Sequence, residues 1–272
     1  SSLVGSEMCI RDRIKFVNSD TAQVPRGSGT LGSRSLQTGG SAIYSASQEV
    51  VSRAKQIAAH MLEASADDIE VGDGGLQVAG VPAKAVSWGD LAAASNDASK
   101  LPDGLEPGAL RHELDFDGSD STFPFGAHVS VVEVDTETGQ VTMLRHVAVD
   151  DCGRILNPML VRGQQHGGIA QGAAQALYEQ VMYDSDGNPI TSNLMDYAIP
   201  SAAELCSFET SNTETDSPRN PLGAKGIGES GTIGATPAIH NAVCDALAPM
   251  GVQHVDMPCT AQRVWAAIQA AR

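Results

Sequence analysis

Two strand-like segments joined by a tight turn, with a long helix-like segment soon after them, place the strongest limit on how this chain can fold. The segments AHVSVVEVD and QVTMLRHVAVD flank TETG, which is typical of a hairpin turn. Apolar residues on both faces of the two segments predict a buried sheet. The following NPMLVRGQQHGGIAQGAAQALYEQ predicts a helix, because Asn157 is a good N-cap and Pro158 suits the first helical position.

The rest of the chain adds further helices and short strands around this unit. Apolar spacing predicts a helix over residues 42–63, and Asp73-Gly74 supplies the turn of a small hairpin. The other expected elements are a strand at 14–21, a short helix at 87–95, a loop over 97–125, strands near 180–184 and 203–210, a helix capped by Thr236, and a closing amphipathic helix with Val264, Trp265 and Ile268 on one stripe. This mixture indicates an α+β or α/β architecture.

Composition excludes several classes of protein. A formal net charge of −16 would repel a phosphate backbone, which argues against nucleic-acid binding. The five cysteines are odd in number and form no CxxC pair, which argues against a disulfide framework, a zinc ribbon and an iron–sulfur ligand set. A reducing compartment, the cytoplasm, fits best. No segment has the length and apolar content of a membrane span, and no signal peptide is visible.

The first thirteen residues, SSLVGSEMCIRDR, differ from the rest of the chain and show no periodicity. They resemble a translated sequencing-adapter tail, so we expect residues 1–13 to be non-native and leave them out of the fold. A native coil is the alternative. In both cases we expect the chain to be the C-terminal portion of a longer protein.

The glycine-rich stretch GAKGIGESG, residues 223–231, demands an unusual backbone. The dinucleotide pattern GxGxxG occurs here and again within residues 27–32, but no buried strand leads into residues 223–231, and we reject the dinucleotide reading for both matches. The stretch also nearly matches a P-loop. Glu229 stands where a P-loop has lysine, and a carboxylate there would repel a triphosphate. Nucleotide hydrolysis is therefore rejected as well.

A positioned carboxylate is the remaining functional reading of this stretch. Glycines let the backbone approach a ligand closely, and successive N–H groups can point at an anion. Glu229 in such a loop would then stand beside a bound ligand, as a general base does. On the residue pattern alone, a flexible glycine turn with a solvated Glu229 is equally well supported.

Read together, several long segments resemble a known family. VDDCGRILNPMLVRGQQHGGIAQGAAQALYE, NLMDYAIPSAAE, NPLGAKGIGESGTIGATPAIHNAVCDAL and VDMPCTAQRVWAAIQ resemble the molybdopterin-binding large subunit of molybdenum hydroxylases, the xanthine dehydrogenase and aldehyde oxidase family. Within that family they are most similar to the branch of aerobic carbon monoxide dehydrogenase large chains. SDTAQVPRGSGTLGSRS resembles the same family's cofactor loop. The resemblance covers residues 14–272, and its motifs fall in the family's order.

The resemblance implies a molybdenum–molybdopterin cofactor, in this branch as the cytosine dinucleotide, and a fold of class α+β. That fold has mixed sheets with packed helices in two lobes, roughly residues 14–110 and 125–272. Glu229 corresponds to the family's active-site base, and no residue of this chain corresponds to a direct metal ligand. The residues implied to bind the cofactor are Lys225 and Gly228 of the same loop, Gln164 at the pterin, and Gly32, Ser33, Arg34 and Ser35 around the dinucleotide phosphates.

The resemblance also implies a reaction and partner subunits. Hydroxylases of the family oxidise a small substrate with oxygen taken from water, and a carboxylate such as Glu229 removes the proton. A carbon monoxide enzyme would convert CO to CO2 at a molybdenum–copper centre, where the glutamate's role is less settled. The expected partners are an FAD-binding medium subunit and a 2Fe-2S small subunit, in a dimer of heterotrimers. An aldehyde or N-heterocycle hydroxylase and a non-catalytic cofactor-binding module are the alternatives.

Four glycines of the segment after Pro158 form small faces at helical spacing, Gly163 with Gly167 and Gly168 with Gly172. We expect them to serve tight helix packing together with close approach to the cofactor.

Five other residues have a structural reading beside a functional one. His166 could serve as a metal ligand, but a lone histidine more often has a structural role and makes hydrogen bonds. Asp150 and Asp151 suit a metal site, but a turn after a strand is the favoured reading. Arg34 suits a bidentate phosphate contact or a surface ion pair. Cys152 is expected to be buried and inert.

Overall fold

The computed structural model describes residues 14–272 except 25, 28 and 119. Residues 1–13, the expected tail, lie outside the described residues. The chain divides into two units, residues 1–31 and 32–272, which are described separately. Residues 14–21 of the first unit form no strand, so the strand predicted there is wrong. The side chains of Ile14 and Phe16 are exposed, and no strand in the described part of the chain pairs with them.

The second unit contains two separate hydrophobic cores, and the first is built around one long helix. Helix α2 (Ser41–Leu62), preceded by the π-helical turn η1 (Leu36–Gly40), packs with a three-stranded antiparallel sheet and the short helix α3 (Trp88–Ala94). Its strands are β1 (Ile69–Gly72), β2 (Gly75–Val78) and β3 (Val81–Ser87), with 3-10 turns η2 (Ala66–Asp68) and η3 (Ala98–Lys100). The predicted helices and hairpin of this region are confirmed. Strand β3 was missed because nearly all of its side chains are exposed.

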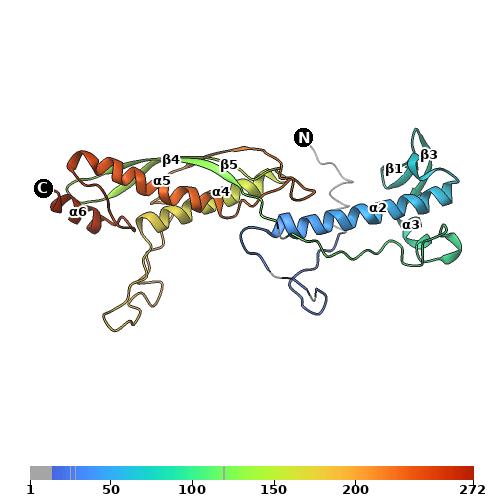
Figure 1. The fold of residues 1–272 in the computed structure, drawn as a ribbon, viewed down its shortest axis with the longest axis horizontal. Coiled ribbons are helices and arrows are strands. Elements are labelled where there is room, and N and C mark those ends of the chain that lie inside the picture. The colour runs from blue at the N-terminus through green and yellow to red at the C-terminus, as the bar shows by residue number, and fades with distance from the viewer. Residues whose placement is uncertain (1–13, 25, 28, 119) are drawn as a thin grey trace. The chain divides into compact units, whose positions relative to one another are not determined.

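The second core lies between a three-stranded sheet and two long helices (Figure 1). Strands β4 (Phe125–Val134) and β5 (Val141–Asp151) pair antiparallel, and β6 (Phe208–Thr213) pairs parallel with β5. The α+β prediction with mixed sheets is therefore confirmed. The expectation that both faces of the hairpin are buried is wrong. Exposed and partly buried side chains alternate along β4. Val129 and Val131 are on the exposed face, and the other face packs on the helices.

The helices of this core follow the sequence signals at some ends and override them at others. Helix α4 (Pro158–Leu177) begins as predicted, and the side chain of Asn157 accepts hydrogen bonds from the N–H groups of Met159 and Leu160. Helix α5 (Ser230–Leu247) begins well before Pro237, so the predicted cap at Thr236 is wrong. Proline normally ends or kinks a helix. Here the first turns of α5 pack against α4, and that packing carries the helix through the proline.

The remaining predictions in this region hold in part. The 3-10 turn η4 (Ala248–Met250) follows α5, and α6 (Ala261–Ala270) closes the fold, with Val264 and Ile268 buried but Trp265 exposed. The strand expected near 203–210 is β6, shifted toward the C-terminus. No strand forms at 180–184, where Tyr183 makes only an isolated bridge with Pro189. Among the described residues no helix is both long and apolar enough to cross a bilayer.

Helices α4 and α5 approach each other closely because glycines line their contact. A Cβ added to Gly172 would lie 2.8 Å from the Cβ of Ala235, and one added to Gly168 would lie 3.0 Å from the Cα of Gly231. Gly163 and Gly167 differ, since an added Cβ there would meet no described atom within 4 Å. Only one of the two predicted glycine faces therefore serves helix packing.

We expect Gly172→Ala to destabilise the domain by about 1–3 kcal/mol, the usual cost of overpacking a filled contact. The matched change Gly163→Ala should be neutral or stabilising by up to about 1 kcal/mol, since alanine favours a helix over glycine. Urea unfolding of both variants checks this. Equal effects of the two substitutions would contradict the packing assigned to Gly172.

Candidate functional site

The glycine-rich loop of residues 223–229 is the last part of the connection from β6 to helix α5, and it is hydrogen-bonded along the end of β5. Ala224 forms an isolated bridge with Gly153, and the N–H of Lys225 donates to the carbonyl of Cys152 at 2.7 Å. The side chain of Asn220 braces the loop by bonding both the carbonyl and the N–H of Ala224, at 2.8 and 3.2 Å. The loop therefore has a defined path, and it delivers Glu229 to the N-cap position of α5.

Glu229 lies beside the turn of residues 32–35, which is far from it in sequence. The hydroxyl of Ser33 donates a hydrogen bond to Oε2 of Glu229 at 3.1 Å. Added Cβ atoms at Gly226 and Gly228 would approach Ser33 to 2.8 and 2.9 Å. The two glycines thus leave the room in which Ser33 sits. Of the glycines in residues 223–231 only Gly223 has a positive φ, at 68°, so Gly226 and Gly228 contribute space and not an unusual backbone.

Gln164 belongs to the same group. A Cβ added to Gly228 would stand 3.4 Å from Oε1 of Gln164, and the Gln164 side chain is exposed on α4. Glu229 is likewise exposed. The fold therefore gathers Glu229, Ser33, Gly228 and Gln164 from three separate segments. Their roles in catalysis and cofactor binding remain predictions.

The turn of residues 32–35 has a strained start. Gly32 and Ser33 both have φ of 58°, and this left-handed conformation costs a residue with a Cβ about 1–2 kcal/mol. The carbonyl of Arg34 then accepts hydrogen bonds from the N–H and the hydroxyl of Thr38, at 3.0 and 2.8 Å. Ser35 is exposed at the start of η1. The turn thus places Ser33 where its hydroxyl reaches Glu229.

Lys225 is engaged inside the protein, although we predicted it to contact the cofactor. Its Nζ lies 3.0 Å from Oδ1 of Asp151 and 4.6 Å from the ring centre of Phe125. Burial alone would raise the pKa of the Asp151 carboxyl, but hydrogen bonds from the Gly153 N–H, Lys225, Thr215 and Thr213 outweigh burial and lower the pKa. This buried pair ties the loop to the end of β5. The cofactor role of Lys225 remains a prediction.

A buried chain of polar side chains runs beneath the site. Gln165 Nε2 donates to Oδ2 of Asp150 at 2.9 Å, and Oδ1 of Asp150 lies 3.3 Å from His128 Nε2. His128 Nδ1 then lies 3.2 Å from His146 Nε2, and His146 Nδ1 lies 2.6 Å from the hydroxyl of Ser130. Burial, together with His128, lowers the pKa of His146 to about 4, so His146 is neutral at physiological pH.

This chain of side chains borders a cavity that is also lined by Ser230, the residue after Glu229. The cavity holds about 130 Å³, and its lining includes His128, Asp150, Ser230, Ile233 and Gly234. Burial acts to raise the pKa of the Asp150 carboxyl, but the hydrogen bonds with His128 and Gln165 outweigh it. The net effect is a lowered pKa, so the carboxyl stays ionised. The two aspartates that we read as a turn are thus buried at the end of β5.

Sequence reasoning missed His128, His146 and Gln165. The two histidines stand on strands whose apolar alternation hid them, and Gln165 adjoins the more noticeable Gln164. His166 lies 3.3 Å from the Thr210 hydroxyl and packs edge-on against Phe208, as its structural reading predicts. Cys152 is buried, and burial raises the pKa of its thiol, as expected for an inert cysteine.

Comparison with known proteins assigns the chain to a family. Residues 6–206 match the family model described as a molybdopterin cofactor-binding domain. The chain belongs to this family. The carbon monoxide dehydrogenase large chain of Hydrogenophaga pseudoflava is 39% identical to it over 270 residues, which are 99% of this chain and 33% of that relative. The predicted family is confirmed.

Two solved structures share the fold of this chain over most of its length. A structure of Cu,Mo-CO dehydrogenase in its carbon monoxide reduced state matches with a TM-score of 0.82 at 38% identity, covering 92% of this chain and 31% of that one. Quinoline 2-oxidoreductase from Pseudomonas putida 86 matches with a TM-score of 0.81 at 40% identity, covering 89% and 31%. This chain therefore spans about a third of the proteins it resembles.

Proposed function

We propose that this chain is part of the large subunit of a molybdenum hydroxylase, in which it binds a molybdopterin cofactor and presents Glu229 as the reacting carboxylate. One observation supports this most directly. The loop that carries Glu229 lies against both the Ser33 turn and the Gln164 helix, and it does so through glycines that leave no side chain between them. A solvated glutamate on a flexible turn would need none of these contacts.

The residues at the site fit an anionic group that is rich in hydrogen-bonding atoms. The N–H groups of a helix's first turn have no partner inside the helix, and at α5 no side chain caps them. The Ser230 N–H donates to the Ile227 carbonyl, and the N–H groups after it suit a negatively charged ligand. The amide of Gln164 adds neutral donors, and the Ser33 hydroxyl, whose proton goes to Glu229, can accept a hydrogen bond from the ligand. Gly163 and Gly167 leave open space beside α4, where a ligand can approach the backbone. Such a set suits a molybdopterin dinucleotide, which we propose is the cytosine form.

Each of these residues has a definite part in the proposed mechanism. The bound cofactor supplies the two-electron redox chemistry. Glu229 takes the proton of the water that provides oxygen to the substrate, and the Ser33 hydrogen bond holds its Oε2 in place. Gln164 orients the cofactor from the helix side. The Lys225–Asp151 pair fixes the loop that carries Glu229.

We propose oxidation of CO to CO2 as the reaction, because a carbon monoxide dehydrogenase large chain matches over nearly the whole chain. Copper in the molybdenum centre belongs to this proposal. The match to quinoline 2-oxidoreductase, at 40% identity, supports hydroxylation of an N-heterocycle as the second candidate. Electrons would leave through a medium FAD subunit and a small 2Fe-2S subunit, in a cytoplasmic dimer of heterotrimers.

Metal analysis and substrate assays of the complete complex test this function. We expect about one molybdenum per large subunit, and dye reduction with CO if copper is present in equal amount. Molybdenum without copper, with dye reduction by quinoline but not by CO, would replace CO with the second candidate. A complex that assembles fully without molybdenum would overturn the proposal.

A further inference from the structure

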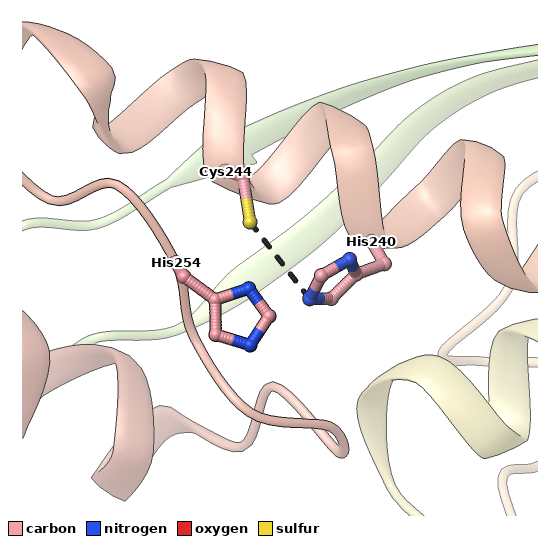
Figure 2. A group of neighbouring side chains, drawn as sticks. All are labelled: His240, Cys244 and His254. Carbon is pink, nitrogen blue, oxygen red and sulfur yellow. Dashed lines mark hydrogen bonds between the residues drawn. The ribbon is translucent and has the colours of Figure 1, made fainter.

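Three side chains with metal-binding atoms lie together at the far end of helix α5 from Glu229. They are His240, Cys244 and His254, and one ligand atom from each lies within 4.8 Å of the other two. Figure 2 shows the Cys244 thiol and both imidazole rings directed into one space. The Sγ of Cys244 lies 3.8 Å from Nε2 of His240, and the two rings meet edge-on with centres 5.2 Å apart.

The fold holds these residues in place independently of any ion. His240 and Cys244 are four residues apart on α5 and therefore project from one face on successive turns. Gly251, with φ of 86°, reverses the chain after η4 and brings His254 back toward that face. Val252 and Val255 on either side of His254 are buried in the core that packs on α5. The cluster is thus assembled by core packing.

We propose that His240, Cys244 and His254 bind a Zn²⁺ ion, with water in the fourth position. One thiolate and two imidazoles suit zinc and disfavour magnesium or calcium, which prefer oxygen ligands. Zinc bonds of about 2.3 Å to sulfur and about 2.0–2.1 Å to nitrogen place the ligand atoms of a tetrahedral site roughly 3.4–3.7 Å apart. The three ligand atoms must therefore move about 1 Å closer together when zinc binds. The Val255 carbonyl, which now lies 2.8 Å from His240 Nε2, gives way to the ion.

The surroundings of the two histidines fit this assignment. His254 Nε2 lies 3.2 Å from Oδ1 of Asp256, and a carboxylate bonded to the outer nitrogen is a common partner of a zinc-bound histidine. His240 Nε2 lies 2.8 Å from the carbonyl of Val255, and zinc replaces this hydrogen bond. That hydrogen bond holds the segment after Gly251 against α5, and the bound ion links the same two parts of the chain in its place.

This site is separate from the proposed cofactor site. His240 follows Glu229 by eleven residues, which is roughly 16 Å along the helix. The occupancy of the zinc site therefore does not depend on molybdenum. The sequence signal was weak, because a histidine and a cysteine one turn apart gain a third ligand only from the chain reversal at Gly251.

Cobalt and zinc titration of the full chain, stripped with chelator under reducing conditions, tests the proposal. We expect one equivalent of Co²⁺ to give a thiolate charge-transfer band that Zn²⁺ abolishes. Cys244→Ser should remove the band, and His254→Ala should weaken zinc binding by at least about 100-fold, more than the ~10–100-fold loss typical of an outer partner. Cys206→Ser, which changes a half-buried thiol outside the cluster, should behave like the parent chain.

Subtracting the cobalt spectrum of Cys244→Ser, prepared in the same way, removes the contribution of any other metal site. A parent chain without the cobalt band would overturn the zinc site, as would a band of equal strength in Cys244→Ser. His254 is exposed, so His254→Ala should fold even if Cys244→Ser does not. For this variant, unchanged zinc affinity is the outcome that rules the site out.

Discussion

Glu229→Gln in the complete large subunit is expected to lower turnover by about 10²–10⁴-fold, the usual contribution of a general base, while molybdenum content stays unchanged. Glutamine has nearly the same shape, and its Oε1 can still accept the hydrogen bond from Ser33. It cannot take up a proton. Steady-state kinetics and metal analysis of the same preparation measure the two quantities separately.

Glu209→Gln is the matched control for this substitution. Glu209 is an exposed residue of β6 whose carboxylate pairs with Arg145, and it makes no contact with the Ser33 turn. Its turnover should equal that of the parent enzyme. If Glu229→Gln also retains full turnover with molybdenum bound, Glu229 is not the base, and the non-catalytic reading of this domain gains support.

Lys225→Met is expected to destabilise the domain by about 3–5 kcal/mol, because it leaves the Asp151 carboxylate buried without its cation. The side chains of Lys225 and Asp151 are only 8% and 0% exposed, so water cannot replace the lost partner. Urea unfolding at neutral pH measures the loss. The double change Lys225→Met with Asp151→Asn should recover most of it, since the amide carries no charge.

Arg145→Met provides the control for burial. Arg145 makes two short hydrogen bonds to Glu209, at 2.6 and 2.7 Å, but the two side chains are 59% and 54% exposed. Surface pairs contribute only about 0–1 kcal/mol, so this substitution should change little despite the better geometry. A loss as large as that of Lys225→Met would show that burial does not explain the effect.

The sign of the pH dependence follows from the lowered pKa of Asp151. In the unfolded chain the Asp151 carboxyl has its ordinary pKa of 3.8 and binds a proton as the pH falls through that value. In the folded protein its pKa is lower, so it stays ionised there. Its contribution is therefore complete at neutral pH and is lost as the pH falls below that value. In Lys225→Met this acid-dependent part of the stability should shrink.

Much of the candidate site could be read from the sequence because its residues sit in local motifs. Glycine at 226 and 228 and a carboxylate at 229 already indicated a backbone that something approaches closely. The identity of that neighbour could not be read, since Ser33 lies 196 residues away from Glu229. The part of Lys225 was hidden for the same reason, because its partner Asp151 ends a distant strand.

What the sequence determined by itself is local. The Asn157 cap, the Asp73-Gly74 turn and the long helix α2 formed as predicted, because each depends on residues within a few positions of one another. Tertiary packing decided the rest. It carried α5 through Pro237 and left one face of β4 in solvent, because side chains from distant segments set burial. It also gathered the zinc ligands and placed Ser33 on Glu229.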